Sequence, residues 1–218
     1  MEAGGAALDE TARMATTPNL YAARLNVDYP EQLDRLSTLL RLVWIVPIAI
    51  IFGLVSVQHS DQIANSSATI SGGLWVATVL MIVFRLRYPR WWFDFARELT
   101  RFGARVGAYL TLVTDRYPST VDEQSVHLDI EYPEAPGELN RWLPLVKWFL
   151  AIPHYIVLFF LWFAAAVAVV IAWFAILFTG RYPKALFDFV VGVGRWHLRV
   201  AAYAFLLVTD EYPPFSLS

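Results

Sequence analysis

The chain has 218 residues and a formal net charge of -2 at pH 7, with 57% hydrophobic and 17% charged residues and a mean hydropathy of +0.48. This composition is more apolar than that of a soluble domain and predicts that lipid surrounds much of the chain. The small negative charge argues against a nucleic-acid partner, and the absence of cysteine excludes disulfides and thiolate metal sites.

Two apolar segments in the first half are predicted to cross a membrane. They follow residues 1–20, which are rich in Ala, Gly, Thr and acidic residues and are expected to form a disordered tail. Leu39–Val57 carries Arg41 as its single charge and has the length that a bilayer core requires. Gly72–Leu86 is shorter, almost wholly apolar, and follows the polar loop 58–71.

The second half contains a longer apolar segment, Leu143–Gly180, which is interrupted only by Lys147, Pro153 and His154. As one straight helix it would reach about 57 Å, nearly twice the ~30 Å hydrocarbon core of a bilayer. The segment must therefore fold back or lie partly in the membrane interface, and the internal repeat described next favours a second hairpin with a minimal tip near 162–166.

A series of short motifs occurs twice in the same order. The equivalent motifs, first occurrence before second, are Asp28-Tyr29-Pro30 with Glu131-Tyr132-Pro133, Arg41 with Lys147, Pro47 with Pro153, Arg87-Tyr88-Pro89 with Arg181-Tyr182-Pro183, Phe93-Asp94-Phe95 with Phe187-Asp188-Phe189, and Thr114-Asp115 with Thr209-Asp210. We divide the chain into the tail 1–20, a first copy 21–118 and a second copy 119–218. Each copy is expected to hold a strand, a transmembrane hairpin and an amphipathic helix.

The positions of Lys and Arg predict the orientation in the membrane. All 17 lie outside the loop 58–71 and outside the expected tip 162–166, so the positive-inside rule places both termini in the cytoplasm. A single tilted span over His154–Thr179 would instead turn the basic residues after it outward. The predicted fold is a mainly α integral membrane protein with four transmembrane helices in two hairpins, related by an axis along the membrane normal.

Further elements are expected on the cytoplasmic side. Before each acidic Tyr-Pro, apolar residues alternate with polar ones, which predicts two strands that pair as a small β-ribbon. After each Arg-Tyr-Pro, the spacing of apolar residues predicts an amphipathic helix. In the first copy the apolar stripe includes Phe95, Leu99 and Leu110, and the second helix, around Ala185–Val208, is more apolar.

The repeated motifs resemble a bacterial membrane-protein family catalogued only as a domain of unknown function. Its members look like tandem copies of an Arg-Tyr-Pro, Phe-Asp-Phe, Thr-Asp-x-Tyr-Pro pattern that ends in Tyr-Pro-Pro-Phe. Here this pattern is Arg181–Phe189 and Thr209–Phe215, and the resemblance extends over Val27–Leu217. The first copy departs from it by ending in Tyr117-Pro118-Ser119. The resemblance implies a bacterial inner-membrane location and brings no catalytic assignment.

Charged residues repeated within the amphipathic helices are the candidate site. They are Asp94, Arg101, Arg105, Asp188, Arg195 and Arg199. The arginines suit anionic lipid headgroups or ion pairs with the aspartates. The aspartates fit either these structural ion pairs or a proton path. The histidines are scattered without ligand spacing, so neither a metal site nor a cofactor is expected.

Three functions are compatible with this pattern. We expect a non-enzymatic scaffold or accessory subunit of a membrane complex, which assembles with itself or with a membrane protein and contacts anionic lipid. The alternative is a small-solute or ion transporter or channel, although the spans carry few polar groups. A membrane-embedded lipid-modifying enzyme is disfavoured because no nucleophile–base pair is visible in the sequence.

Overall fold

The structure is a computed structural model of the full chain, and it describes residues 21–40, 68–119, 124–133, 137 and 139–218. The expected tail 1–20 and most of the expected first span, Leu39–Val57, lie outside these residues. The described part is mainly helical and contains one small sheet.

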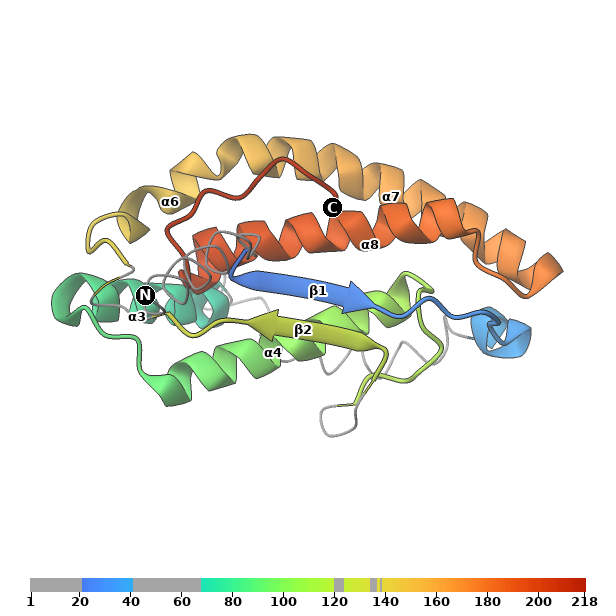
Figure 1. Cartoon of the computed structure of the whole chain (residues 1–218), viewed down its shortest axis with the longest axis horizontal. Coiled ribbons are helices and arrows are strands. Elements are labelled where there is room, and N and C mark those ends of the chain that lie inside the picture. Colours follow the sequence, from blue (N-terminus) through green and yellow to red (C-terminus); the bar gives the residue numbers. More distant parts are fainter. Residues whose placement is uncertain (1–20, 41–67, 120–123, 134–136, 138) are drawn as a thin grey trace, which may run out of the picture.

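An antiparallel β-ribbon lies at the centre of the described part (Figure 1), which confirms the strands predicted from alternation. β1 (Ala23–Val27) pairs with β2 (Val126–Ile130), with Leu25 opposite Leu128. Because successive side chains of a strand point to opposite faces, the ribbon has one apolar face. Its other face carries Arg24, Asn26, His127 and Asp129.

Two helices cover the apolar face of the ribbon. They are α4 (Arg90–Leu110), which contacts β2, and α8 (Lys184–Ala201), which contacts β1. Each begins after an extended proline, Pro89 or Pro183, because proline fixes a backbone angle suited to the first helical turn. Both predicted amphipathic helices are thus present, and each packs on the strand of the other copy.

α7 corrects the expected second hairpin. It runs without a break over Ile152–Thr179, through residues 162–166 where the tip was expected, and the chain reverses only after it. No Gly or Pro occurs at 162–166, whereas Gly180 takes the left-handed conformation that closes a helix (φ 72°). α8 then returns alongside α7 (Figure 1).

The remaining helices are α3 (Ala68–Arg85), which contains most of the second expected span, and the short α6 (Pro144–Leu150). α6 leads directly into α7, with Pro153 in the first turn of α7, where its missing N–H removes no helical hydrogen bond. Within the described residues, α7 is the one helix long and apolar enough to cross a membrane. α3 contributes a shorter apolar helix, Trp75–Arg85.

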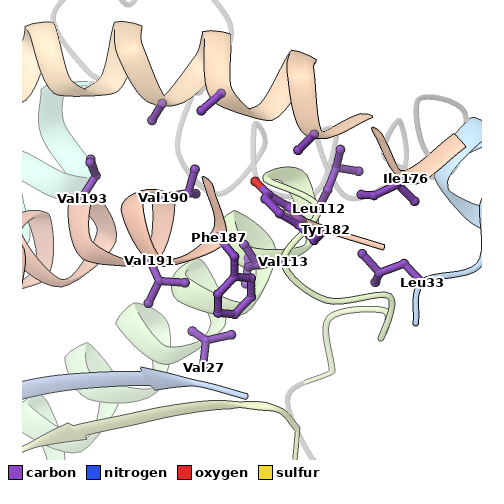
Figure 2. Close-up of a cluster of buried hydrophobic side chains, with 14 of the residues drawn as sticks. Val27, Leu33, Leu112, Val113, Ile176, Tyr182, Phe187, Val190, Val191 and Val193 are labelled. Carbon is purple, nitrogen blue, oxygen red and sulfur yellow. The ribbon is translucent and has the colours of Figure 1, made fainter. Parts of the chain in front are cut away.

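A buried core joins α7, α8 and the end of β1, as Figure 2 shows around Val27, Phe187 and Tyr182. Phe187 lies between two tyrosine rings, with centroid distances of 5.0 Å to Tyr29 and 5.8 Å to Tyr182. This core includes residues from both ends of the sequence, so neither copy packs alone.

Tyrosines of the Tyr-Pro motifs fasten one copy to the other. The Tyr29 hydroxyl donates to the carbonyl oxygen of Tyr182, and the Tyr132 hydroxyl donates to that of Tyr88. Tyr88 and Tyr182 are 3% and 0% exposed, so these two are core residues and not part of an interfacial aromatic belt. Burial raises the pKa of the hydroxyls of Tyr88 and Tyr182, so these two hydroxyls stay protonated and can donate hydrogen bonds of their own.

Candidate functional site

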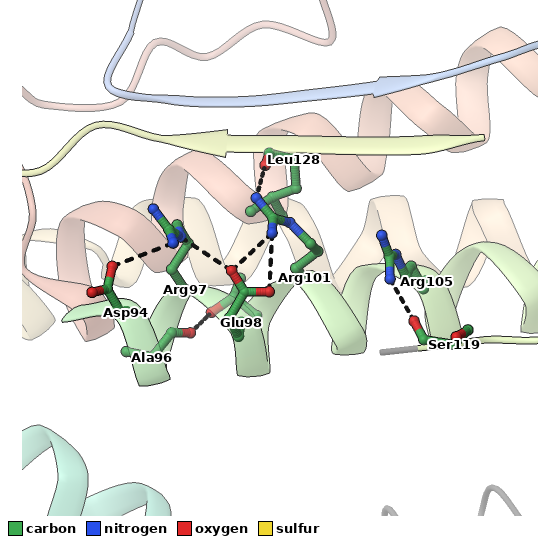
Figure 3. A network of polar contacts seen from close by, with 9 residues as sticks. Asp94, Ala96, Arg97, Glu98, Arg101, Arg105, Ser119 and Leu128 are labelled. Carbon is green, nitrogen blue, oxygen red and sulfur yellow. Dashed lines mark hydrogen bonds and ion pairs between the residues drawn. The ribbon is translucent and has the colours of Figure 1, made fainter. Parts of the chain in front are cut away.

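The charged residues predicted on α4 form a surface network (Figure 3). Asp94 pairs with Arg97 at 3.3 Å, and Arg101 pairs with Glu98 at 2.8 Å. Arg101 also donates to the carbonyl oxygen of Leu128 at 3.3 Å, which ties α4 to β2. Asp94 therefore pairs with Arg97, one helical turn away, and not with Arg101 or Arg105, which the sequence offered as ion-pair partners of the aspartates.

Arg105 and Arg199 differ from the expectation of a polar, lipid-facing side. Each is 8% exposed, and each donates to a backbone carbonyl oxygen, of Ser119 and Ser216 respectively. A guanidinium that binds a carbonyl oxygen in this way holds the segment after its own helix against that helix. These arginines therefore act as internal fasteners in both copies.

Arg195 and Asp188 complete the predicted set on α8. The Arg195 Nε donates to the carbonyl oxygen of Leu25 at 2.9 Å. This contact corresponds to the one that Arg101 of α4 makes with the carbonyl oxygen of Leu128. Asp188 is exposed, and within the described part of the chain it forms no ion pair. The structure thus brings the arginines to backbone carbonyls and leaves the expected pairs with Asp188 apart.

A buried ion pair at the end of the second copy was not predicted from the sequence. Lys147 of α6 is 0% exposed, and its Nζ lies 2.6 Å from Oδ1 of Asp210 and 2.7 Å from the carbonyl oxygen of Thr209. The ammonium also lies over the ring of Tyr203, at 5.1 Å from its centroid. The sequence did contain an indication of this pair, because a lone lysine in an apolar stretch requires a buried anion and Asp210 belongs to a repeated motif.

A second buried polar contact lies close by. His154 is 0% exposed, its Nδ1 accepts a hydrogen bond from the Trp196 indole at 3.0 Å, and its ring stacks on Phe215 at 4.0 Å. Since Nδ1 is the acceptor, the proton of the neutral ring is on Nε2. Within the described residues, no group of three or more His, Cys, Asp or Glu side chains could hold a metal ion.

A cavity of about 530 Å³, hereafter the central cavity, lies between α4, α8 and the apolar face of the ribbon. Leu25 and Leu128 of the ribbon line it, and Trp162 of α7 reaches it. Its α4 wall includes Gly103 and Gly107, at which an added Cβ would meet no atom within 4 Å.

The few polar side chains of the central cavity are already bonded or uncharged. The hydroxyls of Thr100 and Thr111 donate to carbonyl oxygens of their own helix, at 2.7 Å and 2.8 Å. His197 is exposed and packs edge-on against Trp162 with a centroid distance of 5.7 Å. The central cavity is therefore a largely apolar, partly open pocket.

Comparison with known proteins finds a matching protein family and assigns no activity. Residues 142–216 match the family described as Domain of unknown function (DUF4389). This match confirms the resemblance to a family catalogued as a domain of unknown function, and it covers α6, α7, α8 and the Tyr-Pro-Pro-Phe end. No curated protein and no solved structure matches the chain.

Proposed function

We propose that the chain is a non-enzymatic membrane protein that acts as a scaffold or accessory subunit of a membrane complex, or assembles with itself. The observation that carries the proposal is the outer surface of α7. Phe159, Phe163 and Phe178 are 70%, 71% and 78% exposed on a helix without a charged residue. So large an apolar surface is unstable in water and marks contact with lipid or protein.

The charged side chains support a structural role. Lys147, Arg105 and Arg199 are buried and hold the segments that follow the amphipathic helices, while Arg101 and Arg195 tie each amphipathic helix to the strand of the other copy. Because these charged side chains are bonded within the protein, they hold its segments in fixed positions and so give partners a surface of constant shape. Anionic lipid headgroups contact Arg181 and Lys184, the exposed basic residues beyond the end of α7. These two take the place of the arginines that were first expected to contact the headgroups.

The continuity of α7 changes the proposed topology of the second copy. α7, α8 and the ribbon run side by side along the longest axis of the molecule (Figure 1). If α7 stood upright in a bilayer, the polar face of the ribbon, with Asn26 and Asp129, would lie at the depth of the hydrocarbon. We therefore propose that α6 and α7 lie along the membrane with their outer surface in one leaflet, and that both termini are cytoplasmic.

Single cysteines test this topology, because the chain has none of its own. We expect an impermeant thiol reagent added outside to label Ser66→Cys and to leave Ser119→Cys and Arg181→Cys unlabelled until the cells are opened. External labelling of Arg181→Cys would show that α7 crosses the membrane. External labelling of Ser119→Cys would overturn the orientation.

Substitution of the apolar surface tests this contact. The variant Phe159→Ser/Phe163→Ser/Phe178→Ser should lose its co-purifying proteins or lipids, while Tyr117→Ser, an exposed aromatic outside this surface, should keep them. Circular dichroism checks that both variants stay helical. Retention of all co-purifying proteins and lipids in the triple variant would exclude this surface as the contact.

A transporter or channel is the alternative, and the buried Lys147–Asp210 pair next to an apolar surface is the observation that favours it. Purified protein in liposomes distinguishes the two functions. The scaffold function predicts no ion or solute flux. A reproducible flux that disappears in Lys147→Met would establish the alternative instead.

A further inference from the structure

We propose that the central cavity binds one linear acyl chain, from a free fatty acid or from one tail of a phospholipid. This goes beyond the scaffold function: the binding site is the pocket between α4, α8 and the ribbon, and the outer surface of α7 serves only as the route to it. The cavity has about 530 Å³, within the range of pockets that bind small ligands.

The lining decides the chemistry of the ligand. Most of the lining is aliphatic or aromatic, and its polar side chains are Thr100, Thr111, Trp162 and His197. The hydroxyls of Thr100 and Thr111 already donate to carbonyl oxygens of α4. None of the buried polar atoms without a partner in the described residues lines this space. The lining therefore favours an apolar ligand.

The exposed apolar walls of this pocket are unfavourable in water as well. Phe95 and Trp162, which line it, are 51% and 40% exposed, and a ligand that covers their apolar surface is favoured. Gly103 and Gly107 keep it open at positions where the Cβ of an alanine would meet no atom within 4 Å. Glycine in a helix interior is itself destabilising, so two glycines on one wall that face open space are best explained by a ligand that fills it.

The position of the cavity gives the ligand a route of entry. Trp162 lines the cavity, and the next residue along α7, Phe163, is 71% exposed on the surface proposed to face lipid. An acyl chain can therefore pass from that surface to the cavity beside Trp162. The lining contains no Asp, Glu, Lys or Arg side chain that would pair with a charged headgroup inside.

Bromine quenching of tryptophan fluorescence tests the proposal on the full chain in detergent, free of any membrane. Dibromostearate should quench the wild-type protein, and the quenching should be lost in Trp162→Phe. Gly103→Leu and Gly107→Leu should each weaken the apparent affinity about tenfold, because the leucine side chain occupies the ligand space. Gly137→Leu, an exposed glycine outside the cavity, should bind as the wild type does.

A second arm separates the two sources. In nanodiscs that contain a dibromo-phospholipid, quenching specific to Trp162 and absent from Gly107→Leu identifies a phospholipid tail, and quenching by dibromostearate alone identifies a fatty acid. The glycine variants are expected to fold at least as stably as the wild type, since leucine has the higher helix propensity. Equal quenching in Gly103→Leu, Gly107→Leu and wild type would overturn the proposal, whatever the outcome of the α7 surface test.

Discussion

The two copies differ at the turn between the apolar helix and the amphipathic one. The second copy has Gly180 there with φ 72°, and the first has Leu86 with φ 48°, which leucine adopts at a cost. The turn before the Thr-Asp motif, in contrast, has a left-handed leucine in both copies, Leu112 with φ 64° and Leu207 with φ 57°. The backbone path is thus kept where the residue changes, which indicates that tyrosine and arginine contacts to backbone carbonyls hold these turns in place.

A second difference lies within the amphipathic helices. From Tyr109 to Thr114 is one residue fewer than from Tyr203 to Thr209. α8 continues into a π-helical turn over Ala202–Leu206, whereas α4 ends without one. An extra residue in a helix is commonly absorbed as a π-turn. Beyond it the contacts match again, since Tyr182 donates to the carbonyl oxygen of Thr111 and Tyr88 to that of Leu206.

The largest expected effect concerns Lys147, at the position that Arg41 has in the first copy. Lys147→Met leaves the Asp210 carboxylate without its buried partner and should lower the free energy of unfolding by about 3 kcal/mol. If Arg41 has the same role in the first copy, Lys147→Arg should lower the free energy of unfolding by less than about 1.5 kcal/mol, because the positive charge is kept. Unfolding in detergent measures both, and Lys184→Met, an exposed lysine on α8, is the control. Equal stability of Lys147→Met and wild type would contradict the buried pair.

The His154–Trp196 contact has an apolar counterpart in the sequence of the first copy, Ile48 and Phe102. His154→Ile removes the acceptor of the buried indole and should destabilise by about 2 kcal/mol. Adding Trp196→Phe removes the orphaned donor, so the double variant should recover at least half of that loss. A double-mutant cycle by chemical unfolding provides the measurement. Strict additivity would show that the hydrogen bond does not couple the two residues.

A smaller effect is expected from exchange of the turn residues. Gly180→Leu places a side chain at φ 72° and should lower the free energy of unfolding by about 1–2 kcal/mol. Leu86→Gly relieves the strained conformation but loses a half-buried side chain, so its effect should remain within about 1 kcal/mol of zero. Thermal unfolding in detergent compares the two. A larger loss from Leu86→Gly than from Gly180→Leu would mean that side-chain packing, and not the backbone, determines this turn.

Local periodicity was sufficient to predict the ribbon and the two helices that cover it. Alternation located the strands of the ribbon, and the 3.6-residue spacing located α4 and α8. The second hairpin was wrong because the internal repeat was taken to give both copies the same hairpin, whereas α7 continues unbroken through residues 162–166 and packs lengthwise on α8. The contacts of Arg105 and Arg199 were not predictable, because their partners are backbone carbonyls that only the tertiary fold brings close.

The smallest expected effect concerns the π-turn. Deleting Phe205, a 56% exposed residue, gives the second copy the spacing of the first and should convert the π-turn into α-helix. Because Leu207 and the residues after it keep their places, the free energy of unfolding should change by less than about 1 kcal/mol. The matched control deletes Leu110, 48% exposed near the end of α4, where no extra residue is available to lose. That deletion shifts the turn at Leu112 and should cost about 3 kcal/mol or more. A similar loss of unfolding free energy in the two deletions would show that the structure requires a π-turn over Ala202–Leu206. The extra residue of the second copy would then not be the reason for the π-turn.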